Sequence, residues 1–117
     1  MRSKLLAFFL LATAALAQTP SHTATLTWPA PHDASASTTY NVYYVAASCP
    51  ANGSTTGPTW IKANTAPISA LTFVQTIPAG NYCWYVTQVA NGMESLPSNT
   101  AGGTAKPGSV TFSVTIN

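Results

Sequence analysis

The feature that most constrains this chain is an alternation of apolar and polar residues with a period of two. Successive side chains of a β-strand point to opposite faces, so this alternation is typical of strands that bury one face and expose the other. Proline and glycine recur between the short alternating runs, and no window repeats apolar residues with helical spacing. The pattern therefore predicts an all-β protein.

The alternating runs define the expected strands and the side of each strand that turns inward. We expect strands at residues 23–28, 39–46, 59–63, 71–77, 82–89, 98–104 and 109–117. The inward-facing residues, which would form the core, are Leu26, Trp28, Tyr40, Val42, Tyr44, Leu71, Phe73, Ile77, Trp84 and Val86. Short strands with turn signals about every 8–12 residues are typical of a two-sheet sandwich, whose sheets pack about 10 Å apart.

The first 17 residues have the composition of a secretory signal peptide. Arg2 and Lys4 precede an apolar run that closes on Ala15-Leu16-Ala17. This run is shorter than the ~20 residues that span a bilayer. We therefore expect residues 1–17 to be removed on export, and the protein to act in the periplasm, at the cell surface or outside the cell. No later run of the sequence is long and apolar enough to span a membrane.

The exported part has few charged residues. The net charge of +2 comes from the two cations of the signal segment, and the remaining charges balance one another; they are Lys62, Lys106, Asp33 and Glu94. A neutral chain of this kind cannot neutralise a series of phosphates, which argues against nucleic-acid binding. Two carboxylates are also little material for catalysis, so we expect a non-catalytic protein without a cofactor.

His22, His32 and Asp33 are the one polar set that hints at a metal or acid–base site. Two histidines and a carboxylate can bind zinc, but the spacing of these three matches no known ligand pattern. They also lie around a proline-rich loop. We therefore interpret their nearness in sequence as chance and expect no metal site.

Three segments of the chain resemble a known family. Residues 25–31, Thr-Leu-Thr-Trp-Pro-Ala-Pro, resemble the second strand of a fibronectin type III domain, and residues 39–44, Thr-Tyr-Asn-Val-Tyr-Tyr, resemble its third strand. Residues 77–99 are similar to the bacterial run from the tyrosine corner through strand F into a Gly-x-Glu-Ser-x-Pro-Ser turn. The resemblance covers about residues 22–105 and implies an immunoglobulin-like, fibronectin III sandwich for residues 18–105.

The resemblance also implies roles for individual residues. Tyr82 would be the corner tyrosine, whose hydroxyl bonds to the backbone near the preceding turn. Cys49 would follow the third strand, and Cys83 would lie outward near the start of strand F, its antiparallel neighbour. Because these strand ends adjoin and export leads to an oxidising compartment, we expect a Cys49–Cys83 disulfide. Gln88 departs from the family, which usually has a small apolar residue there.

The two ends of the domain depart further from the family. Only residues 18–22 precede the first expected strand, so the family's strand A is missing and that first strand has an open edge. Residues 106–117 add a turn and an extra strand, with apolar residues at Val110, Phe112, Val114 and Ile116. We expect this strand to pair within its own chain, antiparallel to residues 98–104 or as the true final strand. The alternative is donation to a neighbouring molecule.

Three aromatic residues form a candidate binding face. Tyr43 and Tyr85 are expected on the outward side of neighbouring strands, with Trp60 close to them. Exposed aromatic side chains stack on sugar rings or anchor protein partners. Two alternatives are that the cross-strand pair only stabilises the sheet and that Trp60 packs into the core.

Two functions fit these features. The first is an exported binding or adhesion module that holds a protein or carbohydrate partner on Tyr43, Tyr85 and Trp60. The second is a structural subunit of an extracellular filament or surface assembly, joined through the extra C-terminal strand. The low charge of the exported chain would not oppose such self-association.

Overall fold

The computed structural model describes residues 21–107 and 111–117. In this part of the chain the strands are β1 (His22–Thr27), β2 (Thr39–Val45), β3 (Ile61–Lys62), β4 (Thr72–Ile77), β5 (Gly80–Ala90), β6 (Met93–Glu94), β7 (Ala101–Ala105) and β8 (Thr111–Thr115), with a short 3-10 helix at Ala51–Gly53. The predicted signal segment, residues 1–17, and Val110 of the predicted final strand lie outside the described residues.

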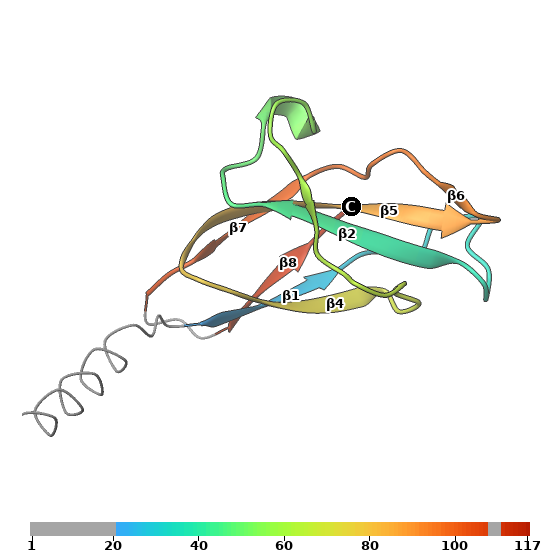
Figure 1. Ribbon diagram of the computed structural model, residues 1–117, viewed down its shortest axis with the longest axis horizontal. Coiled ribbons are helices and arrows are strands. Elements are labelled where there is room, and N and C mark those ends of the chain that lie inside the picture. The colour runs from blue at the N-terminus through green and yellow to red at the C-terminus, as the bar shows by residue number, and fades with distance from the viewer. Residues whose placement is uncertain (1–20, 108–110) are drawn as a thin grey trace, which may run out of the picture.

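The strands form two sheets that pack face to face. One sheet has the order β4-β1-β8, and the other has the order β3-β2-β5-β6 with β7 also paired to β5. Figure 1 shows β2 and β5 in the upper layer and β1 and β4 in the lower layer. The protein is therefore an all-β sandwich compatible with an immunoglobulin-like fold, which confirms the predicted fold class.

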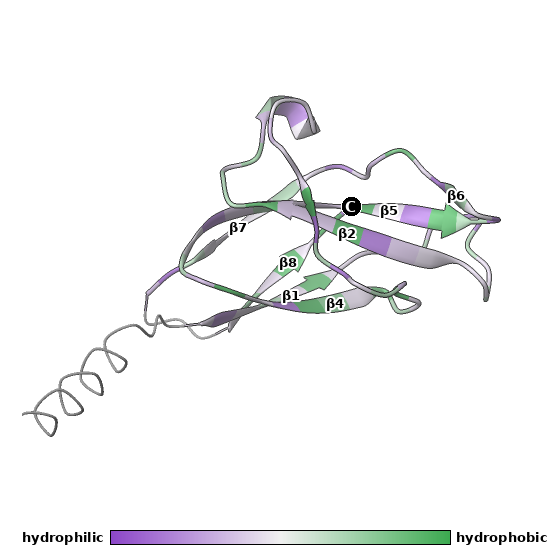
Figure 2. Ribbon diagram, in the orientation of Figure 1, coloured by the Kyte–Doolittle hydropathy of each residue, from purple (hydrophilic) through white to green (hydrophobic). Residues whose placement is uncertain are grey.

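The alternation in the sequence decides which side chains are buried. Along β1, Ala24 and Leu26 are fully buried, whereas Thr27 is exposed. Figure 2 shows the same change along β2 and β5, where hydrophilic and hydrophobic segments follow one another within one strand. Each sheet thus turns an apolar side toward its partner, and burial of that side drives the two sheets together.

Trp84 lies at the centre of the core. Its side chain is fully buried, and its ring lies 6.1 Å from that of Phe112 on β8. The indole Nε1 donates a hydrogen bond of 2.9 Å to Oε1 of Gln75 on β4, so a polar contact also joins the two sheets. A buried N–H without a partner would be costly, and this bond removes that cost at the middle of the interface.

Most predicted inward residues are buried, and three differ. Tyr44 and Phe73 are partly buried and pack against the edge of the core. Leu71 was predicted to face the core, but it lies just before β4 and is 38% exposed. The alternation continues through Leu71, but the strand itself begins only at Thr72. Strand parity therefore gives the correct side of the sheet and does not say where the interior ends.

The C-terminal strand takes a different neighbour from the one expected. Pairing antiparallel to residues 98–104 was wrong, because β8 runs parallel to β1, with Thr23 opposite Thr111 and Thr27 opposite Thr115. After β7 the chain crosses at Lys106 and Pro107 from the five-stranded sheet to the three-stranded one. There β8 covers the open edge of β1 in its own chain and buries Val114 and Ile116. Burial of two aliphatic side chains favours this edge over a more exposed one.

A glycine in β7 makes room for β8. The predicted strand at residues 98–104 is observed at Ala101–Ala105. A Cβ atom placed on Gly103 would lie 2.8 Å from Cε2 of Phe112 and 3.0 Å from Cγ2 of Val114. Because real Cβ atoms do not approach so closely, the side chains of β8 can pack here only against a residue without a side chain.

The turn between β4 and β5 is held by Tyr82. The Tyr82 hydroxyl donates a hydrogen bond of 2.9 Å to the carbonyl oxygen of Pro78, four residues earlier. This is the type of bond that the corner role implies, and the ring itself is buried.

In the described part of the chain, no helix is long and apolar enough to cross a membrane.

Candidate functional site

The candidate site lies on the outer side of the five-stranded sheet and is called the aromatic face, formed by Tyr43, Trp60 and Tyr85. Tyr43 on β2 lies directly opposite Tyr85 on β5 in the antiparallel register. Side chains directly opposite one another in such a pair are close enough to touch. The two rings stack, with their centroids 4.9 Å apart and an angle of 16° between their planes.

Trp60 completes this face from the segment before β3. Its ring lies 4.8 Å from that of Tyr85 at 73°, an edge-to-face contact. Its Nε1 donates a hydrogen bond of 2.8 Å to the carbonyl oxygen of Thr55, which ties the preceding loop to the sheet. Trp60 therefore packs on the outer tyrosines, and the alternative that it enters the core is wrong.

Glu94 is the polar centre beside these rings. The Asn91-Gly92 turn folds β6 back on β5, so that Glu94 pairs with Val89 and its side chain lies on the outer side. Its Oε2 accepts hydrogen bonds from the Tyr43 hydroxyl (2.7 Å), the Thr87 hydroxyl and the Asn41 amide (3.2 Å). Three donors from two strands thus converge on one carboxylate oxygen.

These bonds set the protonation states of the face. The hydrogen bond from Thr87, followed by that from Tyr43, lowers the pKa of Glu94, and the nearby charge of Lys62 adds to this effect. Burial, followed by the contact with Glu94, raises the pKa of Tyr43 to about 12. At neutral pH the face therefore presents an ionised carboxylate next to a neutral phenol.

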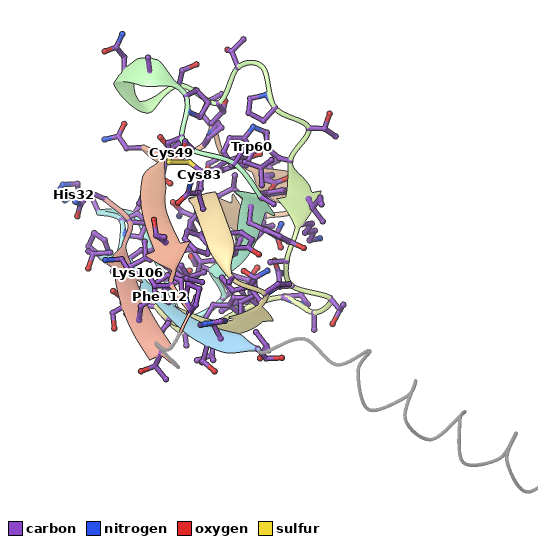
Figure 3. All side chains as sticks on the ribbon, turned by 90° about the vertical axis from the view of Figure 1, so that its left-hand side faces the viewer. His32, Cys49, Trp60, Cys83, Lys106 and Phe112 are labelled. Carbon is purple, nitrogen blue, oxygen red and sulfur yellow. A yellow bond between two sulfur atoms is a disulfide. The ribbon has the colours of Figure 1, made fainter. Side chains whose placement is uncertain are left out.

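The expected disulfide lies on the same side of the sheet. Cys49 and Cys83 are bonded with their Cα atoms 5.0 Å apart, which confirms the prediction. Cys83 has an outward position on β5, as expected, but it is fully buried because the chain around Cys49 covers it. Figure 3 shows the sulfur–sulfur bond and Trp60 on this side. The bridge thus holds one end of the loop whose other end Trp60 fixes.

The histidines and Asp33 do not come together as a site. His22 is buried at the start of β1, where its Nε2 lies 2.9 Å from the carbonyl oxygen of Lys106. His32 and Asp33 lie beyond the other end of β1, and Oδ1 of Asp33 accepts a bond of 3.3 Å from the Gln88 amide. Within residues 21–107 and 111–117, no three potential metal-binding side chains form a group.

Two cavities are lined by residues outside the aromatic face. An apolar cavity of about 270 Å³ at one end of the sandwich is lined by residues that include Trp28, Pro31, Tyr40, Leu96 and Ile116. A more polar cavity of about 480 Å³ beside the disulfide is lined by residues that include Ser48, Asn81, Thr100 and Thr104. Tyr43, Trp60 and Tyr85 line neither cavity. The aromatic face is therefore a part of the open surface, in which all three side chains are partly buried.

The sequence pattern predicted the three aromatic residues of this face and did not predict their polar partners. Glu94, Thr87 and Asn41 were not expected at this face, although a signal for Glu94 exists. A two-residue Asn-Gly connection is typical of a tight hairpin, and counting outward from it pairs Glu94 with Val89 on the side of Thr87. Hairpin counting could therefore have identified Glu94.

Comparison with known proteins adds no relative. No protein-family model matches the chain, and no curated protein matches it either. The functional assignment therefore depends on the geometry of the face itself.

Proposed function

We propose that this protein is an exported, non-catalytic binding module of the fibronectin III type, which holds a carbohydrate ligand on the aromatic face. The observation that carries the proposal is the stacked pair of Tyr43 and Tyr85 with Trp60 against it, next to the ionised Glu94. The resemblance of residues 22–105 to fibronectin III domains and the Cys49–Cys83 bridge support the family and the export.

Carbohydrate fits the chemistry of the face better than a large protein partner. Sugar rings have apolar C–H faces that pack on aromatic rings, and they have hydroxyls that donate to a fixed acceptor. Glu94 is such an acceptor, because its position is set by three hydrogen bonds and its charge is maintained at neutral pH. A protein partner remains the second form of the same proposal and would use the same three rings as its anchors.

The carboxylate of Glu94 is suited to binding and not to acid catalysis. A glycosidase needs a carboxylic acid whose pKa is raised so that it can protonate the leaving oxygen. The hydrogen bonds from Thr87 and Tyr43 lower the pKa of Glu94, which is the opposite change. The residue is thus held as a hydrogen-bond acceptor.

The test is binding to an array of neutral and acidic oligosaccharides. We expect the protein to bind at least one glycan, and we expect Tyr43→Ala and Tyr85→Ala each to weaken that binding by about tenfold, consistent with loss of one stacking contact. Both side chains are outside the core, so the melting temperature should change little. Val74→Ala is the matched control, because Val74 is 56% exposed on the other sheet.

Two results would contradict this function. If no glycan binds but a protein partner is captured through Tyr43 and Tyr85, the carbohydrate form is wrong and the protein form stands. If binding of either kind is unchanged by both tyrosine variants, the aromatic face is not the site.

A further inference from the structure

The apolar cavity of about 270 Å³ is lined by residues from both sheets. Its inner wall is formed by Trp28 and Ile116, which follow β1 and β8, and by Tyr40 and Val86 of β2 and β5. None of these four side chains is more than 6% exposed. The rings of Trp28 and Tyr40 meet edge to face, with their centroids 5.6 Å apart. This cavity, called the end cavity below, is therefore an apolar hollow over one end of the core.

Leu96 lies at the mouth of the end cavity and is 87% exposed. The segment that contains it is fixed to β5 on both sides of the leucine. The Ser95 hydroxyl accepts a hydrogen bond of 2.9 Å from the backbone N–H of Gln88. The Ser98 hydroxyl accepts one of 2.9 Å from the backbone N–H of Val86. An apolar ligand in the cavity would contact this leucine, and the contact would remove apolar surface of both from water.

Trp28 supplies a hydrogen-bond donor without a partner. The other two tryptophans are both paired, because Nε1 of Trp84 donates to Oε1 of Gln75 and Nε1 of Trp60 donates to the loop before it. The Trp28 Nε1 is buried and has no partner within residues 21–107 and 111–117. Nearly all buried N–H groups in proteins are paired, since an unpaired donor loses the bond that water would give it. An unpaired donor on a residue of the cavity wall points to a ligand with an acceptor.

The other groups around the end cavity exclude charged and highly polar ligands. Among the described residues, no charged side chain lines the cavity, so an ion would lose its hydration without gaining a counter-charge. The hydroxyls of Thr87, Ser95 and Ser98 lie in the lining but already form hydrogen bonds within the protein. A sugar would therefore give up more hydrogen bonds to water than the cavity returns.

The volume limits the size of the ligand. An apolar cavity of about 150 Å³ holds benzene, and pockets for drug-sized ligands begin at about 300 Å³. The end cavity, at about 270 Å³, lies between these sizes. A molecule of one or two rings fits these limits, and the aromatic walls of Trp28 and Tyr40 favour an aromatic ring.

We propose that the end cavity binds a small, uncharged aromatic compound that has a carbonyl oxygen. Its ring lies between Trp28 and Leu96, and its oxygen accepts a hydrogen bond from the Trp28 Nε1. Because this nitrogen is shielded from solvent, the indole turns slightly toward the cavity as the bond forms. The inference is independent of the carbohydrate proposal, since Tyr43, Trp60 and Tyr85 do not line this cavity.

The test is an NMR titration of the isotope-labelled protein with acetophenone, and with ethylbenzene as a probe of similar shape that lacks the acceptor. We expect saturable binding of acetophenone, with a downfield shift of the Trp28 indole N–H that exceeds the shifts of Trp60 and Trp84. Ethylbenzene should bind about tenfold more weakly, which corresponds to the loss of one hydrogen bond.

Two variants locate the site. Leu96→Ser should weaken acetophenone binding by about fivefold, because it removes apolar contact at the mouth, and the fold should be unaffected because the side chain is exposed. Met93→Ser is the matched control, because Met93 is 74% exposed and does not line the cavity. Trp28→Phe should make the two probes bind equally; the Leu96 variant keeps the test valid if this core substitution destabilises the protein.

Three results would overturn the proposal. The first is the absence of a saturable shift at the Trp28 indole N–H. The second is equal affinity for acetophenone and ethylbenzene, which would exclude the hydrogen bond. The third is equal binding by Leu96→Ser and the unmodified protein, or a dominant shift at Trp60, which would place the probe elsewhere. Tyr43→Ala should leave acetophenone binding unchanged, so failure here and failure of the aromatic face are distinguishable.

Discussion

The two outer faces of the sandwich differ in chemistry although the same alternation produces both. The five-stranded sheet gathers Tyr43, Tyr85 and Trp60 around the ionised Glu94, whereas the three-stranded sheet has hydroxyl groups at eight of nine outward positions. Their inward sides are alike and meet in one core around Trp84. The comparison shows that the core specifies the fold, while the outward positions, which the core leaves free to vary, decide what each face can bind.

The largest expected effect comes from removing the disulfide. This bond lies on the aromatic side of the sandwich and not on the outer side of the three-stranded sheet. Replacing Cys49 and Cys83 together by alanine opens a link between residues 34 apart in sequence. On the loop-entropy argument, we expect the free energy of unfolding to fall by about 3–4 kcal/mol, as measured by denaturant titration.

Glycan binding by the same double variant gives a second test of the role of the disulfide. Glycan binding should weaken in the double variant, because the loop that ends at Trp60 loses one of its anchors. An unchanged denaturation midpoint would show that the bridge contributes nothing to stability.

A smaller effect is expected from the contact between β7 and β8, which joins the two sheets. In Gly103→Ala, the new methyl group must displace Phe112 or Val114. We expect a loss of about 1–3 kcal/mol in unfolding free energy, the usual cost of overpacking, as measured by denaturant titration.

Gly102→Ala provides the control for this prediction. The nearest atom to a Cβ on Gly102 is Sγ of Cys49 at 3.3 Å, on the other side of the sheet, so the loss should be smaller. Equal losses in the two variants would contradict the tight packing of β8 against Gly103.

The smallest expected effect concerns protonation on the aromatic face. Glu94→Gln removes the charged acceptor of the Tyr43 hydroxyl, so the pKa of Tyr43 should fall from about 12 toward its ordinary value. The fall should be incomplete, because burial is the larger cause of the shift. Phenolate absorbance in a pH titration measures it, and an unchanged Tyr43 titration would contradict the hydrogen bond to Glu94.

The same groups predict how stability depends on pH. The pKa of Glu94 is lowered on folding, so its contribution is present above the ordinary glutamate range and is lost as pH falls through the lowered value. The pKa of Tyr43 is raised, so its contribution is lost as pH rises from about 10 toward 12. Glu94→Gln should weaken the dependence of the unfolding free energy on pH in both the acidic and the alkaline range. The change should be small, because the Glu94 side chain is exposed and solvent screens its interactions.

Local patterns in the sequence predicted much of the fold, and non-local choices did not follow from them. Alternation placed Leu26, Val42 and Trp84 in the core, because side-chain parity is a property of each strand alone. The partner of β8 could not be obtained in this way, because the choice depends on which open edge offers more burial. The position of Glu94 follows from its hairpin, but two of its three donors, Asn41 and Tyr43, lie on β2 and meet it only after folding.

The central claim is that ligand binding occurs on the outer side of the five-stranded sheet. Its most direct test is to titrate the isotope-labelled protein with the glycan that it binds on the array and to map the changes in NMR chemical shift. We predict that the shifted resonances belong to Tyr43, Trp60 and Tyr85 and to their neighbours around Glu94. Changes confined to β4, β1 and β8, or to the cavity at Trp28 and Leu96, would contradict the claim.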